Sequence, residues 1–247
     1  MRIAVLSDIH GNRPALEAVL SDIERKQVDA ILNLGDSLYG PLDPAGTADI
    51  LIGSRILSIA GNEDRIVLVR EADEARAPSL SYTRECLSES HRAWLSALPE
   101  TATYRDQMLL CHGTPECDSE YLLEQVTEHG VGLREEADIN ALLATVKEEV
   151  VLCGHSHCPR TVRLPSGRLV VNPGSVGLQA YTDDSPFPHE METGSPHARY
   201  GILSMTSGEW KVQHILIEYA HDEAADLALK NGRADWACWL RTGRARA

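Results

Sequence analysis

Several features that mark special classes of protein are scarce in this sequence. Phenylalanine occurs once and aromatic residues make up 5% of the chain, so a core must consist mainly of Leu, Ile, Val and Ala. No run of about 18 apolar residues is present, which excludes an ordinary transmembrane helix. The opening stretch MRIAVLSDIHGN lacks the basic start, long apolar segment and cleavage site of a secretion signal. We therefore expect neither a membrane segment nor a signal peptide.

The cysteines do not form a disulfide framework. They are spaced irregularly along the chain, at Cys86, Cys111, Cys117, Cys153, Cys158 and Cys238. Disulfides persist mainly in oxidising compartments, and without a secretion signal we expect reduced thiols. The sequence thus predicts a cytoplasmic protein.

Basic residues are outnumbered by acidic ones. The chain has 23 Lys and Arg against 37 Asp and Glu, a formal net charge of −14, and its basic residues cluster only in the tail, at Arg241, Arg244 and Arg246. Proteins that bind duplex nucleic acid usually present a basic face to the phosphates, so we expect no such partner. Bound divalent cations would offset part of the acidic charge, because a bound ion is often the largest charge in its site.

The rest of the composition is that of an ordinary globular protein, with 43% hydrophobic and 24% charged residues. A length of 247 residues is compatible with one large domain or two small ones. The first half follows one strand–helix rhythm, and the later half supplies residues that complete the same candidate site. We therefore predict a single domain over residues 1–247, large enough to need no disulfide.

The first part of the chain alternates strands with helices. Strands are predicted at residues 2–6, 29–34 and 55–60. Pro14 suits the first turn of a helix, and apolar residues then recur at helical spacing, at Ala15, Leu16, Val19, Leu20 and Ile23. A second helix is predicted at 44–52. This βαβαβ alternation favours a mostly parallel sheet with right-handed crossovers.

The pattern changes further along the chain. We predict helices at 81–98 and 135–146 and strands at 101–104, 107–111 and 149–153, followed by antiparallel strands at 161–164, 169–172, 199–205 and 211–217. Residues 180–198, rich in Pro, Ser, Asp and Glu, are predicted to be a mobile loop. Residues 220–247 are predicted to form a C-terminal helical extension.

Polar residues stand at the ends of successive strands. Five strands each lead into a glycine-containing loop with Asp, His or Asn: Asp8-Ile9-His10, Gly35-Asp36, Gly61-Asn62, His112-Gly113 and Gly154-His155-Ser156-His157. In open α/β sheets, sites form beyond the carboxyl ends of strands. These loops are therefore expected to converge although they are far apart in the sequence.

Each part taken singly is a weak signal. An Asp or Asn after a strand is most often a cap or turn residue, and an HxH pair alone is a weak metal motif. Seven ligand-type side chains together indicate cations, because clustered carboxylates and imidazoles are destabilised unless a cation holds them. Cys153 and Cys158 flank GHSH and suggest a zinc site, but Cys153 is expected inside the sheet as a small apolar residue.

The pattern D-x-H…G-D…G-N…H-G…G-H-x-H resembles the calcineurin-like metallophosphoesterase superfamily, in particular its small prokaryotic, phosphodiesterase-like branch. The stretches SDIHGN, NLGDSLYGP, AGNED, CHGTP, CGHSH and VNPGSVG carry the resemblance, which spans residues 1 to 177. It implies an α/β fold, a four-layer α-β-β-α sandwich with two mixed β-sheets and a metal site at the carboxyl ends of the strands. The change from parallel to antiparallel strands agrees with this.

The same resemblance implies seven metal ligands. Asp8, His10 and His157 would hold a first ion; Asn62, His112 and His155 would hold a second, with Asp36 bridging both. Mixed nitrogen and oxygen ligands suit transition metals better than Ca²⁺. We expect two divalent ions, with Mn²⁺ favoured and Fe, Zn²⁺, Co²⁺ or Ni²⁺ as alternatives.

The expected reaction is hydrolysis of a small organic or nucleotide phosphodiester. Two ions about 3.5–4 Å apart can share a bridging hydroxide that attacks phosphorus, and both would neutralise charge on the phosphoryl oxygens. Asp36, Asn62 and His112 are the predicted catalytic residues, with Asn62 and His112 also beside the phosphate. Asn12 is a further candidate for substrate contact, although its position favours capping of the following helix.

One position departs from the family pattern. The third motif is often G-N-H-D or G-N-H-E, in which the His helps to protonate the leaving group, whereas here it is Gly61-Asn62-Glu63-Asp64. Glu63 could replace that acid only if its pKa were raised; the alternative, slightly preferred, is that it begins a helix, where carboxylates are favoured. Relatives without the His often act on phosphodiesters.

Alternative functions stay open on the same pattern. A phosphomonoesterase, a dinucleotide polyphosphate hydrolase or a protein phosphatase would use the same site. A non-catalytic metal-binding scaffold, as among retromer-type relatives, would be expected to have lost ligands. The turn at residues 172–175 either closes one wall of the site or is only a tight connection. The sequence does not indicate the oligomeric state.

Overall fold

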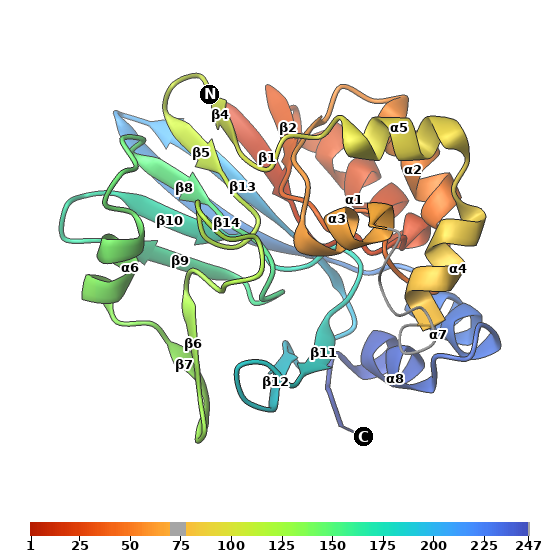
Figure 1. The fold of residues 1–247 in the computed structure, drawn as a ribbon. Helices are drawn as coiled ribbons and strands as arrows, with labels where there is room; N and C mark the ends of the chain where they lie inside the picture. The colour runs from red at the N-terminus through yellow and green to blue at the C-terminus, as the bar shows by residue number, and fades with distance from the viewer. Residues whose placement is uncertain (70–77, 247) are drawn as a thin grey trace.

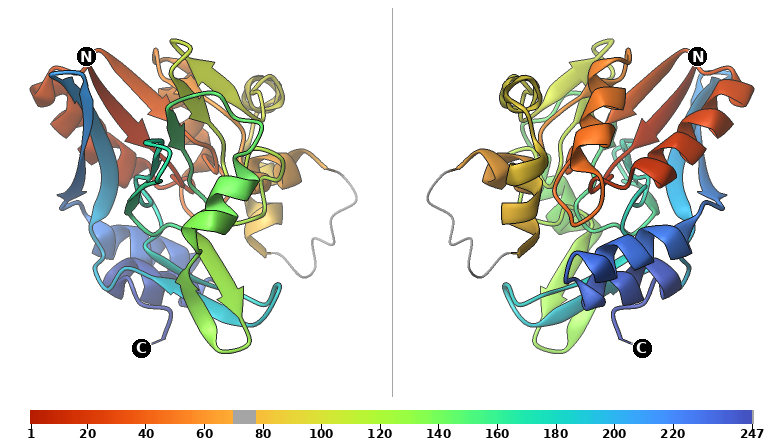
Figure 2. Two further views of the ribbon diagram at one scale, coloured as in Figure 1. Left: turned by 90° about the vertical axis from the view of Figure 1, so that its left-hand side faces the viewer. Right: turned by 90° about the vertical axis from the view of Figure 1, so that its right-hand side faces the viewer.

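The computed structural model describes residues 1–69 and 78–246 and arranges them in layers (Figures 1 and 2). Two five-stranded mixed sheets face each other, and helices cover the outer side of each. This is the predicted α/β sandwich with two mixed sheets, which is confirmed. Two hairpins and a pair of helices are attached at the lower end of the sandwich in Figure 1.

The first sheet has the strand order β14-β13-β1-β2-β3. Its strands are β1 Arg2–Leu6, β2 Ala30–Asn33, β3 Leu57–Ser58, β13 Ala198–Thr206 and β14 Glu209–Ile217. β1, β2 and β3 run parallel, whereas β13 is antiparallel to both β1 and β14. The nearly continuous apolar sequence of β1 fits a strand that is covered on both faces.

The second sheet has the order β4-β5-β8-β10-β9. Its strands are β4 Ala102–Tyr104, β5 Met108–Leu110, β8 Val150–Leu152, β9 Arg160–Arg163 and β10 Leu169–Asn172. The three central strands run parallel, and the edge strands β4 and β9 are antiparallel to their neighbours. Both sheets therefore direct the carboxyl ends of their parallel strands to one edge of the sandwich.

Helices cover the outer faces unequally. The first sheet is covered by α1 Arg13–Lys26, α2 Pro44–Ile52, α3 Asn62–Leu68, α4 Pro78–Cys86 and α5 Glu89–Ser96, and the second by α6 Glu136–Leu142. The single helix predicted at 81–98 was wrong, because two helices occupy this region. Ser88 caps the second of them, its hydroxyl accepting a hydrogen bond from the His91 amide at 3.2 Å.

The cores contain few aromatic residues, as the composition predicted. Side chains such as Ile3, Val5, Leu32, Met108 and Val150 fill the space between the sheets. Cys111 and Cys153 are buried in a separate apolar cluster with residues of α6, and all six thiols are free. Cys153 thus packs as the small apolar residue that was expected.

Elements added to the sandwich include two hairpins that the sequence did not predict. One is formed by β6 Glu124–Thr127 and β7 Gly130–Leu133, and the other by β11 Ala180–Asp183 and β12 His189–Glu192. The prediction of a loop at 180–198 was therefore wrong for much of its length. Polar residues occur both on these strands and at the turn between them, while Ala180 and Met191 on the strands are buried.

The C-terminal helical extension is confirmed as α7 His221–Lys230 and α8 Ala234–Thr242. These helices pack on each other and on β11 through Ala224, Trp236 and Leu240. Residue 247, the last of the predicted extension, lies outside the described residues. Within the described residues, no helix has the length and apolar character needed to cross a bilayer.

Candidate metal centre

The five polar loops predicted from the sequence converge at one edge of the sandwich. They follow β1, β2 and β3 of the first sheet and β5 and β8 of the second. Backbone hydrogen bonds join the loops directly: the amide of Asp8 donates to Gly35 O at 3.0 Å, that of His10 to Asp36 O at 2.9 Å, and that of Gly154 to His112 O at 2.7 Å. The site is thus built on the rigid ends of strands.

The backbone of these loops adopts an uncommon conformation. Five of the predicted ligands have φ values between 51° and 66°: Asp8, His10, Asp36, His155 and His157. Non-glycine residues rarely occupy this left-handed region, and such residues cluster at functional sites where the surrounding structure imposes them. The repeated left-handed turn aims the side chains inward.

Gly61 is required by the approach of two loops. A Cβ atom at this position would lie 2.2 Å from Asp36 Oδ1 and 2.5 Å from the Asp36 amide. Any side chain would therefore displace the predicted bridging carboxylate. The G-N-E-D stretch therefore begins with glycine because any larger residue at position 61 would collide with Asp36.

The first ligand group brings together Asp8, His10 and His157, whose ligand atoms lie within 4.8 Å of one another. His10 Nε2 and His157 Nε2 are 3.0 Å apart, and His157 Nε2 is 3.4 Å from Asp8 Oδ1. All three side chains are buried. Two imidazole nitrogens and a carboxylate that face one point suit a transition-metal ion.

The second group contains Asp36, His112 and His155 within the same 4.8 Å limit. His112 Nε2 lies 3.2 Å from Asp36 Oδ2 and 3.9 Å from Asp8 Oδ1, so it links the two groups. Asn62 lies at the start of α3, and its Oδ1 is buried without a hydrogen bond to the described residues. The structure therefore brings together all seven predicted ligands.

Three histidines are oriented by main-chain carbonyl groups. His112 Nδ1 lies 2.8 Å from Leu34 O, His157 Nδ1 2.6 Å from Leu178 O, and His10 Nδ1 3.1 Å from Tyr39 O. Because a carbonyl only accepts, each Nδ1 must carry a proton, which leaves each Nε2 directed at the site, where it can hold a second proton or a metal ion. Outer hydrogen bonds of this kind are usual for metal-bound imidazoles.

Buried ligand atoms lack ordinary partners. Asp8 Oδ2 and Asn62 Oδ1 accept no hydrogen bond from the residues that the structure describes, and Asp8 Oδ1 and His112 Nε2 make only ion-pair contacts. A buried polar atom without a partner is costly and calls for an explanation. Coordination to cations would satisfy all of them.

The charged groups around the candidate metal centre also favour the binding of cations. Burial alone would lower the pKa of His112, but the Asp36 carboxylate beside it raises that pKa to about 10. Burial similarly opposes protonation of His10, whose pKa is raised to about 9 by Glu63. Burial and the nearby His112 lower the pKa of His155 to about 4, which keeps it neutral as a ligand must be.

Two acidic residues that the motif analysis did not use as ligands support the centre. Glu63 Oε2 lies 3.2 Å from His10 Nδ1, so the residue in the place of the family's acid His orients a predicted ligand. Asp64 accepts from the amides of Ser37 at 3.0 Å and Gly61 at 3.1 Å, which ties the loops after β2 and β3 together. Burial and the Asp36 charge raise the pKa of Asp64 to about 7.

Two further candidates from the sequence, Asn12 and the turn at residues 172–175, support the structure around the site. Asn12 is fully buried, accepts from the Ala15 amide at 3.2 Å and donates to Gly177 O at 2.8 Å, so its side chain caps α1 and does not face the cavity. Ser175, in the turn at residues 172–175, donates to Asp8 O at 2.8 Å. This turn supports the Asp8 loop from within the protein.

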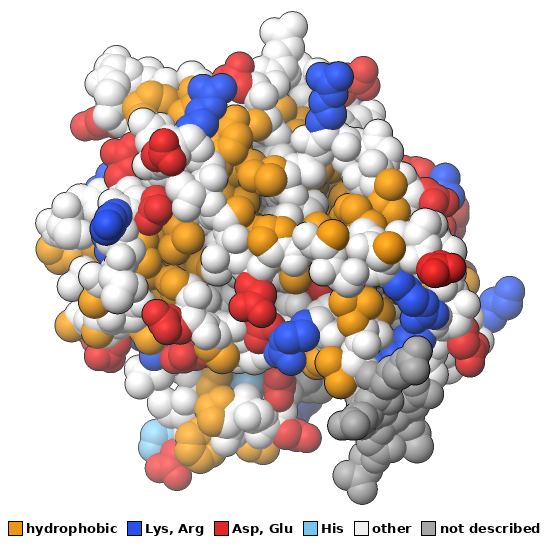
Figure 3. Space-filling model, turned by 45° about the horizontal axis from the view of Figure 1, so that its top comes forward, with side chains coloured by type: hydrophobic (Ala, Val, Ile, Leu, Met, Phe, Trp, Pro, Cys, Tyr) orange, Lys and Arg blue, Asp and Glu red, His pale blue; other side chains and the backbone are white. Residues whose placement is uncertain are grey.

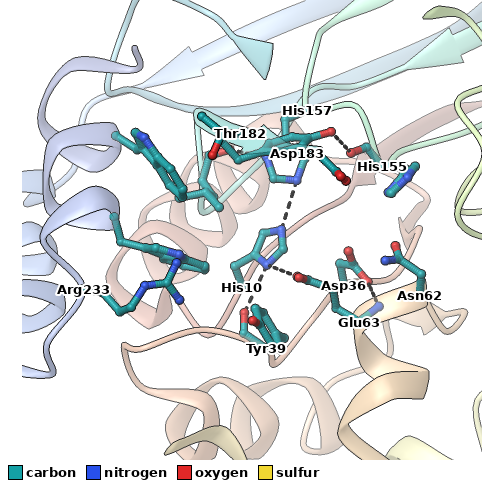
Figure 4. Close-up of a pocket in the computed structure, with 14 residues that line it drawn as sticks. His10, Asp36, Tyr39, Asn62, Glu63, His155, His157, Thr182, Asp183 and Arg233 are labelled. Carbon is teal, nitrogen blue, oxygen red and sulfur yellow. Dashed lines mark hydrogen bonds and ion pairs between the residues drawn. The ribbon is translucent and has the colours of Figure 1, made fainter. Parts of the chain in front are cut away.

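Two cavities meet at the centre and share Asn62, His155 and Asp183. The first, here called the α8 cavity, has a volume of about 200 Å³ and is walled by Tyr39, Tyr181, Arg233, Trp236 and Trp239 (Figure 4). The second, called the hairpin cavity, has a volume of about 500 Å³ and includes Tyr121, Gln125, Arg134 and Ser185. These wall residues lie outside the sequence motifs, and no short spacing links them to one another.

Aromatic side chains hold His155 between the cavities. The Tyr121 ring stacks on the imidazole at a centroid distance of 4.6 Å and an angle of 26°. Tyr181 Oη donates to His155 O at 3.0 Å and lies 2.8 Å from Tyr121 Oη. The hairpin β11–β12 thus contacts a predicted ligand directly.

Comparisons with known proteins agree on the fold. Residues 1–191 match the profile of a family described as the calcineurin-like phosphoesterase superfamily domain. An uncharacterized protein of Methanocaldococcus jannaschii is 25% identical over 250 residues, which cover 95% of this chain and 94% of the relative.

Two solved structures extend the similarity over nearly the full chain. A metallophosphoesterase from Sphaerobacter thermophilus has a TM-score of 0.75 at 23% identity, over 97% of this chain and 98% of that one. A hypothetical protein from Pyrococcus horikoshii OT3 has a TM-score of 0.74 at 22% identity, over 98% of both chains. At these identities the likeness concerns the fold.

Proposed function

The chain belongs to the calcineurin-like phosphoesterase superfamily, and from this premise we propose that it is a metal-dependent phosphodiesterase acting on a small organic or nucleotide phosphodiester. The observation that carries the proposal is the convergence of seven ligand-type side chains, three of which (Asp8, Asn62 and His112) have buried atoms without a hydrogen-bond partner among the described residues. Such a cluster fits divalent cations and is difficult to explain without them.

The residues fit two ions. Asp8, His10 and His157 would hold one, and Asn62, His112 and His155 the other, with Asp36 between them. When bound, such ions supply an activated water near neutral pH and neutralise charge on the phosphoryl group. The mixed donor set favours Mn²⁺, with Fe, Zn²⁺, Co²⁺ or Ni²⁺ as alternatives.

The protein's own groups would bind and orient the ester. Asn62 and His155 line both cavities, so a phosphoryl group can reach them. The Asn62 amide nitrogen can donate a hydrogen bond to a phosphoryl oxygen while its Oδ1 faces the ions. The His112 side chain has no exposed surface, which suits metal binding and leaves it no surface for substrate contact.

The charge of the site favours a diester over a monoester. Among the described lining residues of the α8 cavity, Arg233 is the only Lys or Arg, and it is already paired with Asp235 at 2.7 Å. Asp36, Glu63 and Asp183 line the same cavity. A diester carries one negative charge and a monoester up to two near neutral pH, so the acidic surroundings repel the diester less.

The same charge supports a small substrate. The formal net charge is −14, and on the face shown in Figure 3 Lys and Arg side chains stand singly among acidic ones. A polyanion such as duplex nucleic acid would be repelled, because its binding depends on a basic surface. A single phosphodiester requires no such surface.

Glu63 is not needed as an acid in this proposal. Burial raises the pKa of Glu63, but its carboxyl group contacts His10 Nδ1 at 3.2 Å and is therefore engaged with the imidazole and not with a leaving group. Substrates with good leaving groups should therefore react fastest.

The test compares matched aryl esters. Purified protein freed of metal and reloaded with each ion in turn is assayed with bis(p-nitrophenyl) phosphate and p-nitrophenyl phosphate, and bound metal is counted in parallel. We expect two ions per chain and a higher kcat/KM for the diester. A strong monoester preference would instead support a phosphomonoesterase. Two tightly bound ions without hydrolysis of the activated diester would support a non-catalytic scaffold.

A further inference from the structure

Two cavities of unequal size meet at one candidate phosphoryl position. Asn62 and His155 line both, so a phosphoryl group beside them would be next to the α8 cavity and next to the hairpin cavity. Asp183, at the end of β11, also lines both cavities, and Figure 4 shows it in the α8 cavity. A phosphate with a single substituent would use only one of these spaces.

The hairpin cavity is the larger of the two, and several polar side chains line it. Its volume of about 500 Å³ lies in the range of ligand pockets, about 300–1,000 Å³. Gln125 is exposed on β6, and Arg134 is held at the wall by Tyr121 O at 2.8 Å and Glu120 at 3.3 Å. Amide, guanidinium and carboxylate groups together offer donors and acceptors. This chemistry suits a hydroxyl-rich arm of nucleoside size.

The α8 cavity is smaller, at about 200 Å³, and has an aromatic wall with one cation. The Arg233 guanidinium lies over the Trp236 ring at 5.3 Å and binds both oxygens of Asp235 at 2.9 and 2.7 Å. It also donates to Ser79 Oγ. A guanidinium has five N–H groups, so this fixed side chain retains donors for a bound group. The space suits a compact arm bearing an acceptor.

We propose that the substrate is an unsymmetrical phosphodiester whose large polar arm occupies the hairpin cavity and whose compact arm occupies the α8 cavity. This rests on the proposed function and adds the class of substrate to it. Gln125 and Arg233 then determine specificity, one for each arm. Neither belongs to the predicted ligand set.

The test for the large arm uses two diesters with the same leaving group: thymidine 5′-(p-nitrophenyl phosphate) and methyl p-nitrophenyl phosphate. Gln125→Trp narrows the hairpin cavity, and Glu128→Trp, at the exposed turn of the same hairpin, is the matched control. We expect Gln125→Trp to raise KM for the thymidine ester by about tenfold and to leave the methyl ester unchanged. Equal effects on both esters, or none, would overturn the assignment.

The test for the compact arm compares two arginines of the C-terminal helices. Arg233→Ala should raise KM for both diesters by about tenfold, whereas Arg241→Ala, which breaks an exposed ion pair with Asp226, should leave KM unchanged. Unchanged KM in Arg233→Ala would remove the α8 cavity from the site. An equal loss of inhibition by inorganic phosphate, which carries no arm, would place Arg233 on the phosphoryl group and overturn its role in arm binding.

Failure of the proposed function would be distinct from failure of this inference. Absence of diester hydrolysis by the metal-loaded unmodified protein would contradict the proposed function but not the assignment of the two arms. The Kd values of the two diesters for the variants, measured by calorimetry, would still show whether Gln125 and Arg233 contribute to binding of the arms. Should Gln125→Trp not fold, Ser185→Trp narrows the same cavity from the turn between β11 and β12. Its expected effects and contradicting outcomes are the same.

Discussion

The centre and its cover are built in different ways. The centre consists of the loops after β1, β2, β3, β5 and β8, whose backbones are joined by hydrogen bonds and whose ligand-type side chains are nearly all buried. The cover consists of the hairpins β6–β7 and β11–β12 and the helices α7 and α8. Cover residues such as Gln125, Thr182 and Asp183 are exposed. The predicted metal ligands thus lie on the rigid sandwich, and the residues proposed to contact the arms of the substrate lie on the attached elements.

The family match follows the same division. It ends at residue 191, before α7 and α8 begin, although Arg233 and Trp236 of α8 line the α8 cavity. The same sandwich of metal ligands can therefore be combined with different cavity-lining elements. If the centre and the cover have these separate roles, substitutions in the centre should affect metal binding and kcat, and substitutions in the cover should affect KM.

The largest effect is expected for Asp36→Asn. An amide lacks the charge needed between two cations and offers only one acceptor oxygen. Loss of an outer hydrogen bond to a ligand typically reduces metal affinity or activity about 10–100-fold, so loss of a bridging ligand should exceed this. We expect fewer bound ions by elemental analysis and no measurable turnover.

Asp183→Asn is the control for this variant, because Asp183 lines both cavities but is not a predicted ligand. It should retain two ions per chain. Normal turnover in Asp36→Asn would contradict the bridging role and, with it, the separation of centre from cover.

A smaller effect is expected for Glu63, which touches a ligand and not a metal in this account. Glu63→Ala removes the partner 3.2 Å from His10 Nδ1 and should reduce kcat about tenfold. Glu63→Gln keeps an acceptor oxygen and should retain most activity. The pair is compared by kcat and by metal affinity; an equal, large loss of kcat in both with normal metal affinity would show that Glu63 is the acid.

Tyr181→Phe tests how far the cover supports the centre. The substitution removes the hydrogen bond to His155 O at 3.0 Å and the contact with Tyr121 Oη, but it keeps the ring. We expect kcat to fall by about fivefold, because one neutral hydrogen bond contributes about 1 kcal/mol. A loss as large as that of Asp36→Asn, measured under the same conditions, would mean that cover and centre form one unit.

The convergence of the five loops could be predicted from the sequence because it follows from topology. Parallel strands place their carboxyl ends at one edge, so residues such as Asp8, Asp36 and His155 can be assigned to one site without coordinates. The left-handed backbone and the close approach of Gly61 to Asp36 were not predicted, since they depend on distances between loops. The role of Glu63 was left open for the same reason.

The hairpins of the cover, and the residues that the cover brings to the cavities, could not be predicted in this way. The β6–β7 hairpin has short strands with few apolar residues, EQVT and GVGL, which give no clear alternation. The β11–β12 hairpin was taken for a loop because its turn dominates the local composition. Arg233 and Tyr121 lie far from the motifs in the chain, and only the packing of α8 and the hairpins brings them to the site.

The smallest effect on activity is expected for a change in the frame away from the site. Tyr200 on β13 is fully buried and donates to Asp22 Oδ2 of α1 at 2.6 Å. Burial raises the pKa of the Asp22 carboxyl, but the Tyr200 hydroxyl and two cations on α1 lower it by more. Asp22 therefore stabilises the fold above the unfolded-state pKa of about 3.9, and this contribution is lost as the pH falls through the lower folded-state pKa.

Tyr200→Phe should consequently reduce the free energy of unfolding at pH 7 by about 1–2 kcal/mol, because the lost hydrogen bond has a charged acceptor. At acid pH below the lowered folded-state pKa, the difference from the unmodified protein should shrink, since the carboxyl group is then protonated in both the folded and unfolded states. Urea titrations at the two pH values measure this, and kcat at pH 7 should not change. A fall in kcat without a loss of stability would show that the outer layer of the sandwich also affects catalysis at the centre. The proposed separation between residues that stabilise the fold and residues that act in the reaction would then be wrong.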